Sequence, residues 1–265
     1  PIGNLNEMNP RAIEILNKVD VIACEDTRTS GSLLKHFDIH NRLIAYHNFN
    51  EESSANGILE LLRDGKNVAL ISDAGYPLIN DPGQKIVTLA TSEGFNVVPV
   101  SGPSAFLNAL VASGLVAQPF IFIGFLPQSH SDRVKKLKEY ENYPMTMIFY
   151  EAPHRIEKCL KDCMEVFGDR KMILARELTK MHEEFLRGTI SEILDVVDEL
   201  RGEMVIVMDG NHEDKTKAID MNTIIEMVNA SVENGMSTKD AVKDAAKKTG
   251  ISKNRIYDAV NSNRN

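Results

Sequence analysis

The residues best suited to chemistry lie in one long loop, which runs from Ser72 to Gly83 and reads SDAGYPLINDPG. It holds two carboxylates, Asp73 and Asp81, together with two glycines and two prolines. Glycine and proline fix backbone directions that other residues resist, and a simple turn needs only about four residues. Because the loop follows an apolar run at residues 68–71, it lies at the carboxyl end of a predicted strand, where open α/β sheets bind small molecules. We therefore interpret it as a ligand-binding loop rather than as a tight turn with a capping Asp.

Four other predicted strands also end in polar clusters. These clusters are EDTRT at 25–29, SGPSA at 101–105, YEAPHR at 150–155 and RELTKMHEE at 176–184. At the start of the helix after the second cluster, the amides of Ser104 and Ala105 can face a ligand carboxylate or hydroxyl. The cluster at 25–29 could contact a ligand, or Arg28 could neutralise a neighbouring carboxylate as a structural pair. Both interpretations of this cluster stay open. Polar loops at strand ends in both halves of the chain predict one cleft between two domains.

Alternating strands and helices position these loops. Strands are expected at residues 19–24, 43–46, 68–72, 96–100, 120–124, 145–150, 171–175 and 204–208. Helical periodicity occurs at residues 11–17, 32–37, 52–63, 84–93, 104–113, 155–166 and 190–200. This order predicts an α/β fold with a largely parallel sheet. The nearly continuous apolar run at 120–123 fits a strand that is buried on both faces.

Breaks in the pattern divide the chain into three parts. Residues 1–116 are expected to form an N-terminal α/β domain with a largely parallel sheet, and residues 117–212 a second α/β domain that closes the cleft. The polar run at 211–217 marks a linker, so residues 213–265 form a linker and a helical tail.

Three helices are expected in the tail, at residues 221–233, 238–248 and 253–260. The last two resemble a helix-turn-helix, and a simple helical cap is an equally good interpretation. From Lys215 onward the chain has nine basic and six acidic residues, which gives a net charge of +3. Because the whole chain has a net charge of −8, the residues before Lys215 have a net charge of −11. Such an acidic body repels a polyanion unless its bases are grouped.

Composition and missing motifs exclude several classes. No apolar run approaches the roughly 20 residues that span a bilayer, and Pro1–Leu5 lack the features of a secretion signal, so a cytoplasmic protein is expected. The three cysteines have no disulfide or zinc spacing, and no metal is expected. The sequence has no phosphate-binding P-loop, no dinucleotide-binding glycine turn and no zinc peptidase or α/β-hydrolase motif.

Seven motifs in order resemble the ribosomal RNA small subunit methyltransferase I family. They are PIGNL (1–5), EDTR (25–28), SDAGYPLINDPG (72–83), GPSA (102–105), GFLP (124–127), EAPHR (151–155) and ARELTK (175–180). The resemblance implies a tetrapyrrole-methylase-like fold, in which two α/β domains enclose S-adenosylmethionine and commonly form homodimers, here with a small C-terminal helical domain. It also implies 2′-O-methylation of a cytidine in the decoding region of 16S ribosomal RNA, within the small ribosomal subunit.

Some positions depart from the family pattern. Tyr76, Asn80, Ser101 and Ala152 stand where Thr, Ser, Pro and Ser are expected, and the backbone-defining Gly and Pro positions are intact. Family members usually have an apolar strand before PIGNL, whereas this chain starts inside that motif. We therefore expect the glycine loop at Gly3 to be less ordered than normal.

The site residues follow from these motifs. The expected cofactor-binding residues are Gly3, Asp73, Ala74, Gly75, Ser104, Ala105, Glu151 and Ala152. The expected phosphate contacts are Arg28, Arg155 and Arg176. Methyl transfer to a ribose hydroxyl is an in-line displacement that needs alignment and a proton acceptor. The candidate catalytic residues are Lys180, Glu25, Asp26 and Glu177. Lys180 ranks first because desolvation beside a bound cation would lower its pKa.

Two other functions remain open. A small-molecule methylase of the same fold, acting on a tetrapyrrole or a modified amino acid, would share the cofactor cleft but need a closed acceptor pocket. A non-enzymatic nucleic-acid-binding protein would depend on the helix-turn-helix-like tail.

Overall fold

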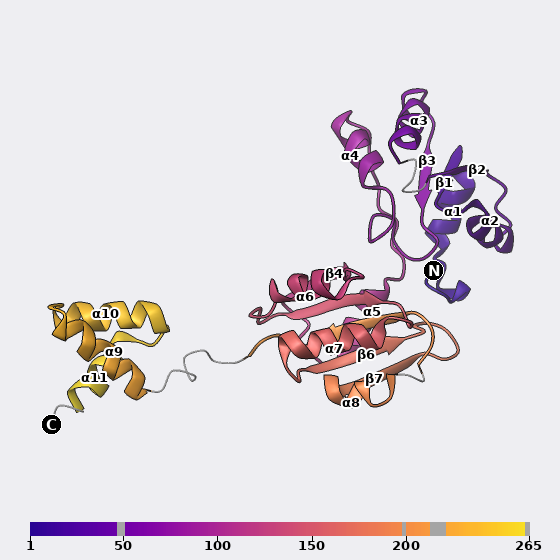
Figure 1. The fold of residues 1–265 in the computed structure, drawn as a ribbon. Helices are drawn as coiled ribbons and strands as arrows, with labels where there is room; N and C mark the ends of the chain where they lie inside the picture. The colour runs from indigo at the N-terminus through magenta and orange to yellow at the C-terminus, as the bar shows by residue number, and fades with distance from the viewer. Residues whose placement is uncertain (47–50, 198–199, 213–220, 263–265) are drawn as a thin grey trace. The chain divides into compact units, whose positions relative to one another are not determined.

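The structure is a computed structural model that describes the chain apart from residues 47–50, 198–199, 213–220 and 263–265 (Figure 1). It divides into two compact units, Pro1–Asn211 and His212–Asn265. Among the described residues, no helix has the length and apolar character needed to cross a membrane.

A three-stranded parallel sheet forms the first part of the larger unit. Its order is β2-β1-β3, with β1 at Val21–Cys24, β2 at Arg42–Ala45 and β3 at Val68–Ile71. The central strand β1 is completely buried, as its four apolar residues require. The helical elements of this part are η1 (Leu5–Glu7), α1 (Pro10–Lys18), α2 (Thr27–His36), α3 (Glu51–Arg63) and α4 (Gln84–Ser92). The parallel pairing predicted for this region is confirmed.

A five-stranded sheet forms the second part. Its strands are β4 (Phe120–Phe125), β5 (Thr146–Glu151), β6 (Lys171–Arg176), β7 (Glu184–Thr189) and β8 (Met204–Met208), in the order β4-β5-β8-β6-β7. Only β4 and β5 pair in parallel, and the other three pairs are antiparallel. The expectation of a largely parallel sheet is therefore wrong here. A short loop without a helix joins β6 to β7, and such a connection gives antiparallel neighbours.

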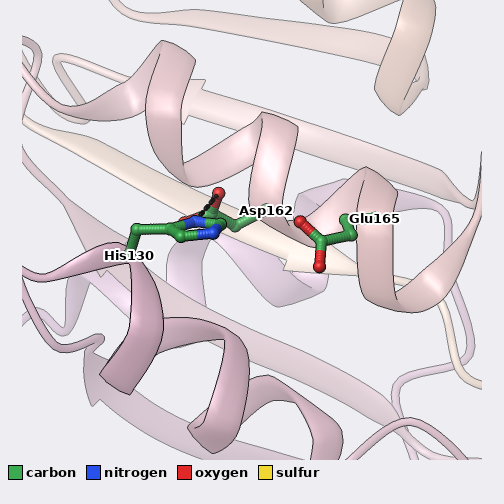
Figure 2. Close-up of side chains that lie close together, drawn as sticks. All are labelled: His130, Asp162 and Glu165. Carbon is green, nitrogen blue, oxygen red and sulfur yellow. Dashed lines mark hydrogen bonds and ion pairs between the residues drawn. The ribbon is translucent and has the colours of Figure 1, made fainter.

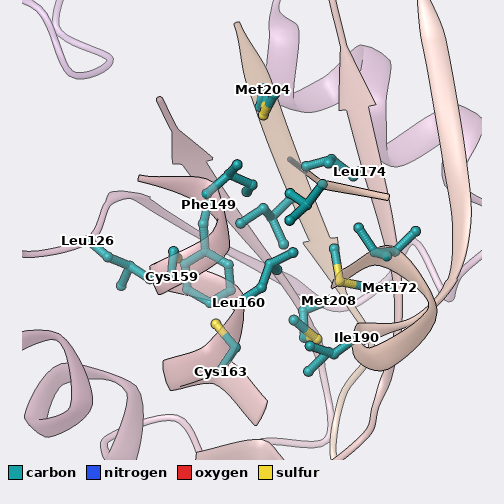
Figure 3. Close-up of a cluster of buried hydrophobic side chains, with 14 of the residues drawn as sticks. Leu126, Phe149, Cys159, Leu160, Cys163, Met172, Leu174, Ile190, Met204 and Met208 are labelled. Atoms are coloured by element: carbon teal, nitrogen blue, oxygen red, sulfur yellow. The ribbon is translucent and has the colours of Figure 1, made fainter. Parts of the chain in front are cut away.

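Four helices accompany this sheet: α5 (Ala105–Ser113), α6 (His130–Lys138), α7 (Ile156–Phe167) and α8 (Ile190–Leu194). One core cluster places Phe149 and Leu174 of the sheet with Leu160 of α7 and Ile190 of α8, all of them inaccessible to solvent (Figure 3). A second cluster joins α5 to β5, β6 and β8. The domain boundary between residues 116 and 117 stays a prediction, although α5, which precedes it, packs on the second sheet.

Several predicted elements differ from the structure. Residues 96–100 form no strand, and Val97 and Val98 are exposed, because β3 pairs only with β1 among the described residues and offers this segment no ladder. The strand β7 and the helix α6 were not predicted, since β7 is an edge strand that tolerates polar residues and α6 is rich in lysine. The helix expected at 190–200 ends at Leu194, and residues 198–199 lie outside the described residues.

The smaller unit contains the three expected helices, which are α9 (Met221–Glu233), α10 (Thr238–Thr249) and α11 (Lys253–Ser262). They enclose a core of their own, in which Ile224, Val228 and Ile256 are fully buried. Gly250 ends α10 in a left-handed conformation, with φ of 72°, as glycine does at helix ends. The resemblance of α10 and α11 to a helix-turn-helix stays a prediction.

Candidate functional site

Hydrogen bonds within the larger unit join several of the predicted loops. The N–H of Gly75 donates to the carbonyl of Pro1 at 3.2 Å, which joins the SDAGYP loop to the PIGNL loop. The N–H of Asn4 donates to Oγ1 of Thr179 at 3.2 Å, which joins PIGNL to the loop after β6. Three motifs far apart in sequence therefore form one junction, and the loop at Pro1–Leu5 has defined contacts.

Gly3 and Lys180 are in close contact at this junction. Gly3 has φ of +140°, and a Cβ atom at this position would lie 2.7 Å from Cγ and 2.8 Å from Cε of Lys180. The aliphatic stem of Lys180 therefore lies across a backbone that only glycine leaves open. Its Nζ donates to Glu177 Oε1 and to Glu203 Oε2, each at 3.0 Å.

The loops of the three-stranded sheet are joined to the start of α5. The N–H of Asp26 donates to Oδ1 of Asp73 at 3.3 Å, so the EDTR and SDAGYP loops touch. The hydroxyl of Tyr76 accepts a hydrogen bond of 2.9 Å from the N–H of Gly102. Tyr76, one of the departures from the family pattern, thus connects the ligand loop to the GPSA turn.

Backbone strain concentrates in these loops. Among the described residues, the non-glycine residues with positive φ are Asp38, Leu78 (71°), Asn80 (67°), Glu177 (50°) and Thr179 (68°). Such conformations cost of order 1–3 kcal/mol each and persist where the surroundings enforce them. All but Asp38 lie in the loops after β3 and β6, which supports a functional role for those loops.

Asp26 and Arg28 form an exposed ion pair just after the carboxyl end of β1. Nη2 of Arg28 donates to Oδ2 of Asp26 at 2.8 Å, and Asp26 also caps α2 through the N–H of Arg28. The hydrogen bond from the guanidinium lowers the pKa of Asp26 to about 2. Such a weak base is poorly suited to take a proton from a hydroxyl near neutral pH. Glu25, the neighbouring candidate, is half-buried.

In this structure the pKa of Lys180 shifts in the direction opposite to the one that ranked it first. Burial lowers the pKa of Lys180, but its hydrogen bonds to Glu203 and Glu177 outweigh that effect, and the pKa is raised. The same bond with Lys180 lowers the pKa of Glu177. Lys180 is therefore a cation and Glu177 its counter-ion. This pairing makes both of them weak candidates for the general base, although they remain at the junction.

Asp81 is a functional candidate that the sequence did not predict. Burial and the nearby charge of Asp73 raise its pKa, while a hydrogen bond with Ser72 opposes the rise. Tyr150, at the end of β5, also has a raised pKa because of burial, and the charge of Asp81 adds to the rise. Both carboxylates of the loop were visible in the sequence, but the burial that distinguishes Asp81 was not.

A separate polar cluster lies between α6 and α7, where ligand atoms of His130, Asp162 and Glu165 lie within 4.8 Å of one another (Figure 2). Asp162 is buried, and its oxygens already accept from Nδ1 of His130 at 2.9 Å and from Nε of Arg133 at 2.6 Å. A buried guanidinium beside the carboxylate repels a metal cation. We therefore assign this cluster to the packing of α6 against α7.

Comparison with known proteins identifies the family of the chain. A sequence profile of the tetrapyrrole (corrin/porphyrin) methylases matches residues 1–194. This chain belongs to the tetrapyrrole methylase family. Two relatives, both called ribosomal RNA small subunit methyltransferase I, come from Bacillus subtilis and Escherichia coli O157:H7. They are 44% identical over 265 residues and 42% identical over 264 residues, and the matches cover 98% and 97% of this chain and 91% of each relative. Within the tetrapyrrole methylases, the chain therefore belongs to the ribosomal RNA small subunit methyltransferase I family, as its motifs predicted.

Solved structures confirm the fold. The methyltransferase CobJ has a TM-score of 0.57 at 18% identity, covering 79% of this chain and 90% of CobJ. Diphthine synthase has a TM-score of 0.60 at 12% identity, covering 78% of this chain and 86% of that protein. The predicted two-part α/β methylase fold with a helical C-terminal addition is confirmed. The chain is a methyltransferase, and S-adenosylmethionine is the methyl donor of its family.

The residues at the junction suit this donor of the tetrapyrrole methylases. The amino-acid part of S-adenosylmethionine has a carboxylate. The first N–H groups of α5 lack partners within that helix, as at every helix start, and could bind this carboxylate. Ser104 precedes them, is buried and makes no capping bond with its side chain. The exposed carboxylate of Asp73 suits the ammonium and sulfonium charges. The same joined loops contain Gly3, Ala74, Gly75 and Ala105. Their assignment to the cofactor site agrees with this geometry and stays a prediction.

Glu151 is buried, and its contacts differ from those of an open cofactor ligand. Its Oε1 accepts from the N–H of Ala152 and from Nε of Arg155, both at 2.8 Å. Its Oε2 is buried without a hydrogen-bond partner among the described residues. Glu151 therefore holds the loop that carries Ala152 and Arg155, and this contact limits its ability to bind a cofactor directly.

The three arginines expected to contact phosphate have different environments. The side chain of Arg28 is 90% exposed, whereas those of Arg155 and Arg176 are 15% and 21% exposed. Arg176 donates through Nε to Oε2 of Glu184 at 2.5 Å across the β6–β7 pair. Arg28 is therefore the most accessible of the three to an RNA phosphate.

Proposed function

We propose that this methylase transfers the methyl group of S-adenosylmethionine to the 2′-hydroxyl of a cytidine in 16S ribosomal RNA, in the decoding region of the small ribosomal subunit. The observation that carries the proposal is the similarity to ribosomal RNA small subunit methyltransferase I over nearly the whole chain, at 44% identity in one relative. The joining of the PIGNL, EDTR, SDAGYP, GPSA and ARELTK loops supports it, because these loops would hold donor and acceptor together.

The proposed mechanism depends on alignment and on one proton acceptor. The donor supplies an electrophilic methyl group on a cationic sulfur. Rigid loops that hold two reactants in line contribute much of the acceleration of such a transfer. Of the carboxylates at the junction, Asp81 combines partial burial with a raised pKa, so we propose that one of its oxygens takes the proton of the ribose hydroxyl.

The positive charge of Lys180 has a positioning role in this proposal. Its stem covers Gly3, and its Nζ ties Glu177 to Glu203, so it fixes the loop after β6 against PIGNL. Glu25, Asp26 and Glu177 remain proposed members of the site. Their contribution would be to hold the junction loops and to balance the charges of Arg28 and Lys180.

The proposed partners follow from the substrate. Arg28 would contact RNA phosphate, and the tail would add an electrostatic contact with RNA. A homodimer is proposed as in other tetrapyrrole methylases. It would cover exposed apolar side chains on α5, among which Val111 is 77% exposed. A protein that modifies small ribosomal subunits would work in the cytoplasm.

The direct test is methyl transfer from labelled S-adenosylmethionine to small ribosomal subunits that lack the modification. The expected product, after digestion of the RNA to nucleosides, is 2′-O-methylcytidine identified by mass spectrometry. A tetrapyrrole substrate is assayed in parallel. Labelling of the tetrapyrrole alone, or of no substrate, would contradict the proposal.

The role of Asp81 is tested with Asp81→Asn, which keeps the shape of the side chain. We expect kcat to fall by about 10²–10⁴, the usual contribution of a general base. The matched control is Asp64→Asn, an exposed carboxylate in the turn after α3. Unchanged kcat in Asp81→Asn would exclude Asp81 as the base.

A further inference from the structure

A cavity of about 580 Å³ opens at the carboxyl ends of the parallel strands β4 and β5. Its apolar lining includes Ile123, Phe125, Leu126 and Pro127, from the end of β4 and the GFLP motif. Ligand pockets commonly have volumes of roughly 300–1,000 Å³ and mostly apolar walls with a few polar groups. The size and the lining therefore fit a flat ring system with a polar attachment.

The polar part of the lining consists of basic residues and the neutral Gln128. Lys136 of α6 and His154 and Arg155 of the EAPHR motif border the cavity, and among the described residues no carboxylate does so. Arg155 is held in place because its Nε and Nη2 donate to Oε1 of the buried Glu151 at 2.8 and 2.5 Å. Nζ of Lys136 also donates to Oε2 of Glu139 at 2.7 Å, so one of its N–H groups is used. The remaining donors of the fixed guanidinium and the ammonium, beside an apolar wall, favour an anionic ligand such as a phosphate.

Phe125 gives the cavity an exposed aromatic ring. The residue is 54% exposed, although it ends a strand whose preceding residue Gly124 is buried. Its ring contacts Tyr150 edge to face, with centroids 5.5 Å apart, so the neighbouring strand supports it. Aromatic rings of this kind are the usual surface on which unpaired RNA bases stack.

We infer that this cavity binds one nucleotide of the RNA substrate beside the methylated residue, with its base on Phe125 and its phosphate near Arg155 and Lys136. The inference rests on the proposed function and adds a base-binding subsite to it. The adenine of the cofactor is the other ring that could enter. S-adenosylmethionine is cationic at sulfur and has no phosphate, so a basic border suits an RNA nucleotide better.

The test compares Phe125→Ala, which removes the ring, with Phe125→Trp, which keeps a stacking surface. Val196→Ala is the matched control, because Val196 is also exposed and apolar but does not line the cavity. Three quantities are measured for each protein: the KM for small ribosomal subunits, the Kd for a single-stranded RNA oligonucleotide with the sequence around the target cytidine, and the Kd for S-adenosylhomocysteine by calorimetry.

Stacking of one base predicts that Phe125→Ala weakens RNA binding roughly five- to 150-fold, with S-adenosylhomocysteine affinity within twofold of the unsubstituted protein. Phe125→Trp should restore RNA binding, and Val196→Ala should leave all three quantities unchanged. An equal loss of S-adenosylhomocysteine affinity would assign the cavity to the cofactor and overturn the inference. So would RNA binding that does not depend on residue 125.

Lys136→Gln provides a second variant on the exposed side of α6, in case Phe125→Ala folds poorly. It should weaken RNA binding and reduce its dependence on salt. A variant without either effect would also overturn the inference. Failure of the proposed function gives a different pattern, because the unsubstituted protein itself would then leave small ribosomal subunits unmethylated and bind the oligonucleotide no better than an unrelated RNA.

Discussion

The two sheets of the larger unit are built from similar short apolar strands but bury them differently. In the five-stranded sheet, β8 is buried along its whole length and β5 at all but one residue. In the three-stranded sheet only β1 is fully buried, while β3 is half-buried and β2 is partly exposed. The larger sheet has helices on both faces, since α7 and α8 join one core cluster and α5 joins the other.

Because of this difference, we expect the two sheets to contribute differently to the stability of the fold and to contact with a ligand. The five-stranded sheet contributes the extensive core, and the three-stranded sheet contributes the loops EDTR and SDAGYP with exposed or half-buried carboxylates. Non-glycine residues with positive φ occur in the loops after β3 and β6, at Leu78, Asn80, Glu177 and Thr179. Substitutions in the two regions should therefore change different measured quantities.

The largest expected effect distinguishes the two cores. Leu174→Ala in β6 removes a side chain that is completely buried, and we expect the free energy of unfolding to fall by about 2–5 kcal/mol. Leu43→Ala in β2 removes the same atoms from a half-buried site and should cost clearly less. Urea denaturation measures both. Equal losses would show that the smaller sheet is as important for stability as the larger one.

A loop substitution should show the opposite behaviour. Asp73→Ala removes an acceptor from the junction, and we expect S-adenosylhomocysteine affinity to fall by about 1–3 kcal/mol with little change in melting temperature. Asp64→Ala serves as the control for removal of an exposed carboxylate. Unchanged affinity in calorimetry would remove Asp73 from the cofactor site.

The helical tail extends the comparison to the second unit. A protein that ends at Asp214 keeps the whole larger unit and lacks the net charge of +3 that follows, so S-adenosylhomocysteine affinity should be unchanged. Methylation of small ribosomal subunits should weaken, and the difference from the full chain should shrink as salt rises, because the tail is net positive. Equal activity of both proteins at low and high salt would show that the tail is only a helical cap.

Arg28 and Arg176 test the role of exposure within the site. Arg28→Ala should raise the KM for small ribosomal subunits and leave the melting temperature nearly unchanged, because its side chain is 90% exposed. Arg176→Ala should instead lower the melting temperature, because it leaves Glu184 without its partner across β6 and β7. The reverse pattern would exchange the roles of the two residues.

The smallest expected effect concerns the pKa of Asp26. In Arg28→Ala we expect it to rise from about 2 toward the ordinary value of 3.8, because the hydrogen bond that lowers it is lost. A lowered pKa in the folded state means that Asp26 stabilises the fold above pH 3.8 and loses that contribution as the pH falls toward 2. NMR titration of the carboxyl carbon measures the pKa in both proteins. An unchanged value would assign the shift to the start of α2 instead.

The sequence predicted the polar loops well because their glycines, prolines and carboxylates are local signals. The order of the motifs also predicted the family, and the structure joins PIGNL, SDAGYP and ARELTK by hydrogen bonds. Strand pairing was harder, since β8 inserts between β5 and β6 in the antiparallel sense and nothing within residues 204–208 specifies a direction. Residues 96–100 have the apolar character of a strand but do not pair with a strand among the described residues.

Charge states were the least predictable property of the site. The sequence places Lys180 three residues from Glu177, but the second carboxylate, Glu203, comes from residues far along the chain. Together with the bond to Glu177, that contact raises the pKa of Lys180 against the effect of burial. Asp73 and Asp81 are the same residue type in one loop, so the sequence does not distinguish them. The packing of the loop buries Asp81 more than Asp73 and raises the pKa of Asp81. Tertiary environment, not residue type, sets these properties.

The contact between Asn80 and Gly124 has a consequence for evolution. A Cβ atom at position 124 would lie 2.3 Å from Oδ1 of Asn80, and Gly124 also has φ of +77°. A relative could therefore place a side chain at 124 only with a smaller residue at 80 and a changed backbone at the end of β4. These two positions, 44 residues apart, should vary together among relatives, so that the history of one loop limits the substitutions accepted by the other.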